Sequence, residues 1–239
     1  DKDDNYVFDI YYRENGKDNF IKENGFSPEG FVKGDLKIVD FDLDGDNDII
    51  FSGELQNGMP MGGVIYNTIL KENSNNWTNF YYKNCSIEVY NQRGSMKYII
   101  LGEDSSGNNA IGGTGADIIY NKPKLKNGDI ATADFNNDGN LDIVFTGEDE
   151  NGNPVSELHI GENFIENLPA SGGYSKSSIE LLGLRESTVD WVDYDMDGDL
   201  DLFITGISAS SGPKAILYET EIRNKKKETR RMKYELRNK

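Results

Sequence analysis

Short apolar runs rich in β-branched and aromatic residues recur along the chain, and polar, Gly-containing segments separate them. Three of these runs, 49–51, 143–145 and 202–204, each follow a similar acidic stretch. Runs of this length and composition predict β-strands. The residues in front of the acidic stretches, such as 36–39 and 188–192, also predict strands. Each acidic stretch is therefore expected to join two strands.

This pattern belongs to a longer repeat. A Gly in each acidic stretch is followed eight residues later by a second Gly, in the pairs 45/53, 139/147 and 198/206. A polar loop and another strand come next, near 63–67, 156–160 and 215–218. A fourth copy, with Gly94 and Gly102, lies between the first two, and its later strand is expected at 117–121. The repeat motifs thus lie near 36–67, 85–121, 130–160 and 188–219.

The repeat predicts the fold class. Its Gly positions 45, 94, 139 and 198 are spaced by 49, 45 and 59 residues, and units of that length with about four strands are typical of propeller blades. We expect an all-β fold over residues 1–222, a β-propeller of four-stranded blades with four recognisable repeats. Segments near 9–16 and 232–236 would add half-blades, giving either about five blades or part of a larger propeller. Residues 223–239 form a basic tail, either solvated or a closing strand.

The acidic stretches carry the candidate chemistry. All three fit the pattern D-x-[DN]-x-D-G-x-x-D, with as many as five carboxylates in nine residues. Hard oxygens at positions 1, 3, 5 and 9 with Gly at position 6 for a sharp turn suit Ca²⁺, and clustered carboxylates need such a counter-charge. The side chains concerned are Asp40, Asp42, Asp44, Asp46 and Asp48, then Asp134, Asn136, Asp138, Asn140 and Asp142, then Asp193, Asp195, Asp197, Asp199 and Asp201.

An EF-hand does not explain these stretches. An EF-hand loop has Glu at position 12 and lies between helices, whereas position 12 here is Phe51, Phe145 or Ile204. The tight-turn chemistry of Asp-Gly and Asn-Gly is the simpler alternative, but it does not account for three copies of the same carboxylate spacing. We expect about three Ca²⁺ sites, each in a loop between two strands.

The fourth copy has no such carboxylates. Its corresponding positions are Val89, Asn91, Arg93 and Lys97. We expect no metal there, with an Arg or Lys side chain in the volume of the ion.

Charge and composition exclude several functions. The 239 residues include 25 Lys and Arg against 42 Asp and Glu, a net charge of −17, which disfavours nucleic acid and anionic lipid as partners. No apolar run approaches the length of a membrane span. One Cys and one His exclude a disulfide framework and a multi-histidine site. His159 aligns with Tyr218 within a strand, which favours a packing position.

The acidic stretches at 40–50 and 193–203 are similar to the FG-GAP/VCBS-type repeats of integrin α-subunit propellers and secreted bacterial surface proteins. The resemblance covers residues ~9–222. It implies a β-propeller with Ca²⁺ between adjacent strands of a blade, held by side chains at positions 1, 3, 5 and 9. It also implies main-chain carbonyl ligands from Asp46, Asn140 and Asp199. Asn136 at position 3 departs from an all-carboxylate set, so the second loop is expected to bind more weakly.

The resemblance implies a calcium-stabilised, non-enzymatic binding or scaffold module of a secreted or cell-surface protein. A protein or glycan ligand would bind a propeller face, in adhesion or a related role. Candidate contacts are Trp77, Phe80, Tyr81 and Tyr82, whose alternative role is to fill the gap between blades. Two other functions stay open: a subunit of a larger surface assembly, and a catalytic or non-catalytic part of a glycan-active enzyme. We expect no catalytic residues, because nearly all clustered carboxylates are assigned to calcium.

Overall fold

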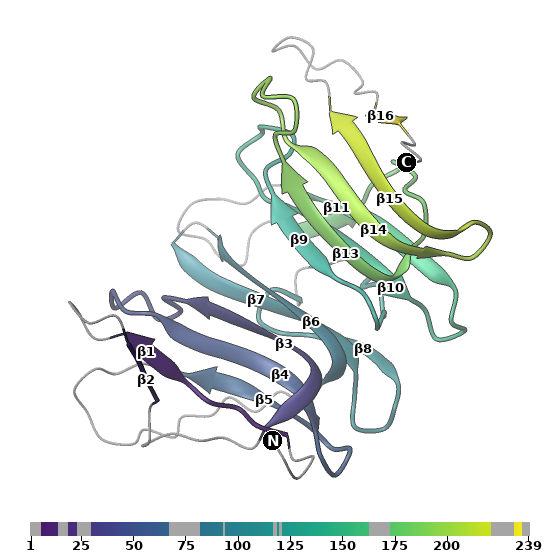
Figure 1. Ribbon diagram of the computed structural model, residues 1–239. Coiled ribbons are helices and arrows are strands. Elements are labelled where there is room, and N and C mark those ends of the chain that lie inside the picture. The colour runs from purple at the N-terminus through teal and green to yellow at the C-terminus, as the bar shows by residue number, and fades with distance from the viewer. Residues whose placement is uncertain are drawn as a thin grey trace.

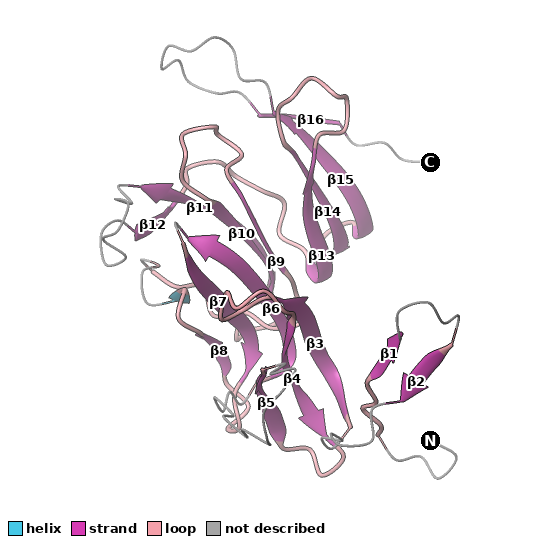
Figure 2. Ribbon diagram, turned by 90° about the vertical axis from the view of Figure 1, so that its left-hand side faces the viewer, coloured by secondary structure: helices cyan, strands magenta, loops and turns pink. Residues whose placement is uncertain are grey.

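The computed structural model describes residues 6–13, 19–22, 30–66, 82–92, 94–116, 119, 121–162, 173–220 and 232–235. Strands dominate this part of the chain, and all of their pairings are antiparallel (Figure 1). The predicted all-β class is confirmed. Loops make up most of the remainder (Figure 2).

Four sheets follow one another in chain order, and each is a simple meander. The first sheet contains β3 (Phe31–Val39), β4 (Asp48–Leu55) and β5 (Pro60–Ile65). The second contains β6 (Lys83–Gln92), β7 (Ser95–Glu103) and β8 (Asn109–Gly112). The third contains β9 (Ile130–Ala133), β10 (Asp142–Glu148), β11 (Pro154–Glu162) and β12 (Gly173–Lys176). The fourth contains β13 (Arg185–Val192), β14 (Asp201–Ser208), β15 (Gly212–Thr220) and β16 (Met232–Glu235).

The sheets form an open row. The first sheet lies at the bottom of Figure 1 and the fourth at the top, and the described strands do not close into a ring. The first strands β3, β6, β9 and β13 contact one another in turn along the row. The structure therefore shows a repeated antiparallel sheet, and its described strands do not form the closed ring of a propeller.

On the central strands of the second and third sheets, alternate residues face the two neighbouring sheets, whereas the central strands of the first and fourth sheets each face one. Ile50 on β4 packs in one cluster with Ile87 and Ile100 of the second sheet. On β7, Ile99 and Leu101 belong instead to a cluster with Phe145 of the third sheet. A third cluster joins the third and fourth sheets through residues such as Val144, Leu158, Leu202 and Ile204. Burial on both faces explains why these strands are continuous apolar runs.

An N-terminal segment covers the free face of the first sheet. The ring of Phe8 lies 5.4 Å from that of Phe31 and 5.6 Å from that of Phe51, and the rings of Phe31 and Phe51 are 5.3 Å apart. The segment then forms a two-stranded sheet from β1 (Tyr11–Arg13) and β2 (Phe20–Lys22). The strand expected near 9–16 therefore lies outside the four sheets.

The structure differs from the expected repeat in two further places. The third strand of the second repeat is β8, at 109–112, and not the segment 117–121. Of that segment, Ile119 makes only an isolated bridge to Tyr174. β16 lies within the basic segment 223–239 and pairs with β15, so it extends the fourth sheet.

A left-handed residue recurs at the start of each sheet, and the sequence analysis missed it. Lys33, Asn84, Asn127 and Glu186 have φ between 46° and 51°, and the register of β3, β6 and β13 shifts there. Such bulges re-aim the residues that follow. After the first bulge, Asp35 Oδ2 accepts a hydrogen bond at 2.9 Å from the backbone N–H of Ile87 in the second sheet.

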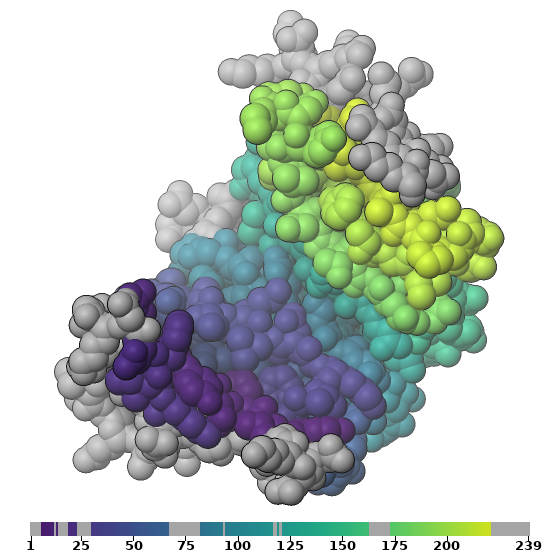
Figure 3. Space-filling model, in the orientation of Figure 1, coloured from purple at the N-terminus to yellow at the C-terminus, as the bar shows by residue number. Residues whose placement is uncertain are grey.

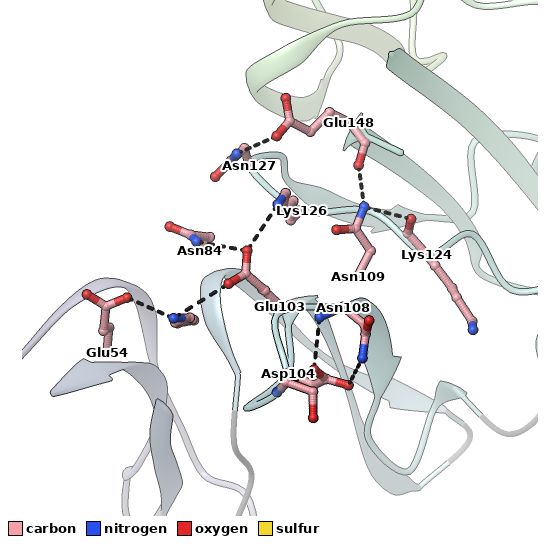
Figure 4. A network of polar contacts seen from close by, with 12 residues as sticks. Glu54, Asn84, Glu103, Asp104, Asn108, Asn109, Lys124, Lys126, Asn127 and Glu148 are labelled. Atoms are coloured by element: carbon pink, nitrogen blue, oxygen red, sulfur yellow. Dashed lines mark hydrogen bonds and ion pairs between the residues drawn. The ribbon is translucent and has the colours of Figure 1, made fainter. Parts of the chain in front are cut away.

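A ladder of charges links the sheets at the opposite rim from the acidic loops. Glu54, Glu103 and Glu148 each follow the second Gly of a repeat and lie in equivalent places (Figure 4). Lys83 Nζ lies 3.4 Å from Glu54 and 3.5 Å from Glu103. Lys126 Nζ lies 3.0 Å from Glu103. A cation of each following sheet thus contacts the Glu of the preceding one.

The ladder continues to the start of the fourth sheet and stops there. Arg185 Nη1 lies 3.7 Å from Glu148 Oε2, and Asn127 Nδ2 donates to Glu148 Oε1 at 2.8 Å. In the fourth sheet Ile207 occupies the place of the Glu, directly after Gly206. The charge pattern therefore sets the fourth sheet apart from the other three.

Candidate metal centres

Three acidic loops connect the first and central strands of the first, third and fourth sheets. Position 9 of each pattern (Asp48, Asp142 or Asp201) is the first residue of the central strand. Each loop therefore joins two adjacent strands, as the pattern indicated. The loops share a backbone conformation with positive φ at positions 4 and 6. The residues are Leu43 and Gly45, Asn137 and Gly139, and Met196 and Gly198.

The carboxylate at position 1 turns into its loop in all three copies. Asp40 accepts from the N–H groups of Asp44 (3.0 Å) and Gly45 (3.1 Å). Asp134 accepts at 2.9 Å from the N–H groups at positions 5 and 6 of its loop. Asp193 accepts from Gly198 N–H at 3.2 Å. The loop backbone therefore fixes this oxygen pair in place.

Positions 3 and 5 form successive turns of the same kind. At position 3, Asp42, Asn136 and Asp195 accept from the N–H two residues later, at 3.3, 2.8 and 3.2 Å. The position 5 carboxylates do the same at 3.1, 2.9 and 2.9 Å. Such side-chain turns curl a short segment around its own oxygens. Three loops with different sequences thus direct the same side chains inward.

The carboxylate at position 9 is buried and anchors the loop to the sheet. Asp48 Oδ2 accepts from Phe41 N–H at 2.9 Å, which closes the first loop on itself. Asp201 accepts from Tyr194 N–H at 3.1 Å and, with its other oxygen, from Thr220 N–H on β15 at 2.8 Å. Asp142 accepts from Gly161 N–H on β11 at 3.0 Å. In the fourth sheet, Asp201 thus connects the loop, the central strand and the third strand.

The side chains come close enough to share one cation. In the first loop, one oxygen from each of Asp40, Asp42 and Asp48 lies within 4.8 Å of the others. In the third loop the same holds for Asp193, Asp195 and Asp197. The first group reproduces positions 1, 3 and 9 of the expected ligand set and the third group positions 1, 3 and 5. In the second loop Asn136 supplies an amide oxygen at position 3.

Crowding of like charges is visible in the pKa of several carboxyls. Burial, followed by the charges of Asp48 and Asp44, raises the pKa of Asp42. Burial and then the charge of Asp197 raise the pKa of Asp195. Asp46 Oδ1 is shielded from solvent and accepts no hydrogen bond from the described residues. The donor set is all oxygen and mostly anionic, which fits a hard divalent cation such as Ca²⁺.

The second repeat has a tight hairpin where the others have an acidic loop. Pairing of β6 and β7 continues to Gln92 and Ser95. Lys97 lies within this ladder, opposite Tyr90, so there is no loop interior for its side chain to fill. Arg93 lies outside the described residues. The expected cation in place of the metal is therefore wrong for Lys97, because the loop itself has been shortened.

The candidate ligand-contact residues receive little support. Trp77, Phe80 and Tyr81 lie outside the described residues. Tyr82 packs against the cluster between the first and second sheets, and burial raises its pKa. Its position favours the gap-filling role.

His159 is a core residue of the third sheet. Its side chain is fully buried on β11, with its ring edge-on to Phe145 at 5.3 Å. Nε2 lies 3.1 Å from Glu157 Oε2, and Lys176 Nζ lies 2.6 Å from the other oxygen of Glu157. This contact set is that of a packing position with a polar edge.

The described residues contain no helix long and apolar enough to cross a membrane. Comparison of the chain with protein-family models and with curated proteins finds no match.

Proposed function

We propose that this chain is a calcium-stabilised repeat protein of the FG-GAP/VCBS type, whose sheets are blades of a β-propeller. In this proposal it is a non-enzymatic binding or scaffold module of a secreted or cell-surface protein, with a protein or glycan ligand on a propeller face. The observation that carries the proposal is the agreement of three acidic loops in backbone conformation and side-chain direction.

The structural role of calcium follows from where the loops sit. Each loop fixes the connection between a first strand, which contacts a neighbouring sheet, and a central strand, which packs against a neighbouring sheet on at least one face. When bound, Ca²⁺ would supply the counter-charge for the oxygens at positions 1, 3, 5 and 9. A cation that binds only the folded chain adds about 2.7 kcal/mol per site at a concentration of 100 times its Kd. Millimolar extracellular calcium can saturate even weak sites of this kind.

Thermal unfolding in calcium and in EGTA tests the proposal, together with calorimetric titration of the calcium-free protein. We expect calcium to raise Tm and to bind at about three sites. The triple variant Asp40→Asn, Asp134→Asn, Asp193→Asn should lose most of this response. An unchanged Tm with no heat of binding would falsify the proposed metal role.

The chain offers a matched control. Asp104 and Asp149, in the hairpins after β7 and β10, accept backbone hydrogen bonds in turns of the same type. The variant Asp104→Asn, Asp149→Asn should keep the full calcium response, because two and four residues after each Asp these turns have Ser or Asn in place of a carboxylate. An equal loss in both variants would assign the effect to turn stability and not to a metal.

A further inference from the structure

Among the described residues, no segment covers the outer face of the fourth sheet in the way that a following sheet covers the equivalent faces of the other three. Ile50, Ile99 and Val144 occupy one repeat position and are fully buried against the next sheet. Phe203 occupies this position on β14 and is 40% exposed. Its neighbour on β15 is Leu217, which corresponds to Val64 beside Ile50 and Leu158 beside Val144.

This face also carries a polar group that matches the one linking the second sheet to the third. On β6, Glu88 comes two residues after Ser86, the residue that ends the bulge. On β13, Asp190 comes two residues after the equivalent residue, Thr188. Glu88 accepts from Thr132 N–H of the following sheet at 3.1 Å. Asp190 lies opposite Phe203 on β13 and is exposed. This surface, called the donor face below, consists of Phe203, Leu217 and Asp190. Equivalent surfaces elsewhere in the row are interfaces between sheets.

The two ends of the row are treated differently. At the first sheet, Phe51 occupies the position that faces a preceding sheet, and Phe8 and Phe31 bury it completely. No described segment stacks in that way on Phe203. Figure 3 shows the fourth sheet at the upper right, in green and yellow.

We propose that the donor face docks a repeat sheet of a second, different chain of this type, one whose corresponding first-sheet face has no aromatic cover. Such a partner offers large apolar residues at two alternate positions of its central strand, as Leu202 and Ile204 do inside this row. Free N–H groups of its first strand would meet Asp190. In the fourth sheet Ile207 stands in the place of Glu54, Glu103 and Glu148. The partner therefore needs an apolar residue, in place of a Lys or Arg, where it meets Ile207.

Two other occupants fit less well. The first sheet of an identical chain presents Phe51 already covered by Phe8. Two donor faces in contact would bring the carboxylates of Asp190 and Glu219 together from both copies, in a chain of net charge −17. Like charges in contact disfavour that association. The Phe8 cover therefore disfavours an identical chain as the partner.

Removing the aromatic cover creates a probe of the required chemistry from the chain itself. We expect Phe8→Ser to uncover the first sheet, so that one molecule docks on the donor face of the next. Light scattering after gel filtration should then show a mass that rises with concentration to at least twice that of the monomer. The wild-type chain and Phe8→Leu, which keeps an apolar cover, should stay monomeric. All samples are kept in the same calcium buffer.

A second substitution identifies the surface. Phe8→Ser combined with Phe203→Glu should return to the monomer. Phe8→Ser with Met59→Glu, a change at an exposed site in the hairpin between β4 and β5, should still associate. A folded Phe8→Ser chain that stays monomeric would overturn the proposal, and so would association insensitive to Phe203→Glu. Wild-type association through Phe203 would identify an identical copy as the occupant and would also overturn it. Circular dichroism of each variant verifies its strand content, and calcium binding of the loops is measured separately.

Discussion

Asp129 Oδ2 accepts a hydrogen bond at 3.1 Å from the backbone N–H of Val189, sixty residues further along the chain. The other oxygen, Oδ1, accepts from Ser86 Oγ at 2.6 Å and from Ile130 N–H at 2.9 Å. One carboxylate in the third sheet therefore holds groups from the second, third and fourth sheets. First strands of neighbouring sheets are not paired by a backbone ladder among the described residues. Their relative positions are fixed by side-chain bonds such as this one and by single backbone bonds, from Asn127 N–H to Asn84 O at 3.2 Å and from Glu186 N–H to Asn127 O at 2.7 Å.

Replacing Asp129 should loosen this junction. Hydrogen bonds to a charged group contribute about 1.5–3 kcal/mol each, and a buried donor left unpaired adds a further cost. We expect Asp129→Ala to lower the free energy of unfolding by about 3 kcal/mol in urea titrations. Thr188→Ala, at the equivalent but exposed place in the fourth sheet, should change it by less than about 0.5 kcal/mol. Equal effects would mean that Asp129 has no special role.

Ion pairs of the charge ladder that join two sheets should contribute more to the free energy of unfolding than an ion pair within one sheet. Lys83 contacts Glu54 and Glu103 in two sheets and is largely shielded from water. Within the part of the chain that the structure describes, Lys33 forms its ion pair with Glu54 alone, across β3 and β4, and its side chain is more than half exposed. We expect Lys83→Gln to cost about 1 kcal/mol, and Lys33→Gln less than about 0.5 kcal/mol. Both costs should shrink in high salt, because ions screen such pairs. The opposite ranking would show that inter-sheet position does not matter.

Position 4 of the acidic loops carries backbone strain that can be relieved. Met196 has φ 61° and is 89% exposed, and Leu43 has φ 64°, whereas the second loop has Asn137 at φ 52°. The left-handed region costs a large side chain about 1–2 kcal/mol, and Asn tolerates it better. Met196→Asn should therefore raise the free energy of unfolding by about 1 kcal/mol. Met59→Asn, at another exposed Met without positive φ, is the control and should show no gain.

Asn136→Asp should stabilise the protein when calcium is present and destabilise it when calcium is removed. The second loop would gain a fourth carboxylate among positions 1, 3, 5 and 9, and calcium affinity depends on the number of charged ligands. We expect tighter binding at this loop by on the order of tenfold. In EGTA the added charge should lower Tm by repulsion, and in calcium the variant should melt above the wild type. Lower Tm in both buffers would count against a metal at this loop.

Low pH should lower the stability of the third sheet near its edge strand β12, because Glu157 becomes protonated. Its hydrogen bond with His159, followed by that with Lys176, holds the pKa of Glu157 below its ordinary 4.5. The folded pKa is lower than the unfolded one, so this stabilisation is present above pH 4.5 and is lost as pH falls through the folded pKa. Glu157→Gln should lower stability near neutral pH and flatten its decline below pH 4.5. Parallel pH profiles of variant and wild type would contradict this.

Much of the repeat could be predicted from sequence because its signals are local. Apolar runs gave the central strands, and the acidic spacing located three loops whose side chains do turn inward. The predicted loop positions of the second repeat were wrong because its first loop is shorter than those of the other repeats. Gly45 lies ten residues after Asp35, whereas Gly94 lies only eight after the corresponding Ser86. Counting back from Gly94 therefore assigned loop positions to strand residues.

The bulges and the ladder depend on contacts between distant segments, and their sequence signals are weak. Lys33-Gly34-Asp35 and Asn127-Gly128-Asp129 share a Gly-Asp pair. The structure explains that Gly, because a Cβ at Gly34 would collide with Ser52 O and one at Gly128 with Thr146 O. Cys85 and Ser187 take the same place in the other sheets, which hides the pattern.

The short hairpin between β6 and β7 divides the proposed calcium loops into two groups. One loop lies before it along the row and two lie after it, and the sheet between them has no acidic loop of its own. An ion bound in the first sheet can influence the other two loops only across this second sheet, through contacts such as the packing of Ile100 on one face of β7 and of Ile99 on the other. The chain would then respond to falling calcium as two separately titrating halves joined by a metal-indifferent spacer.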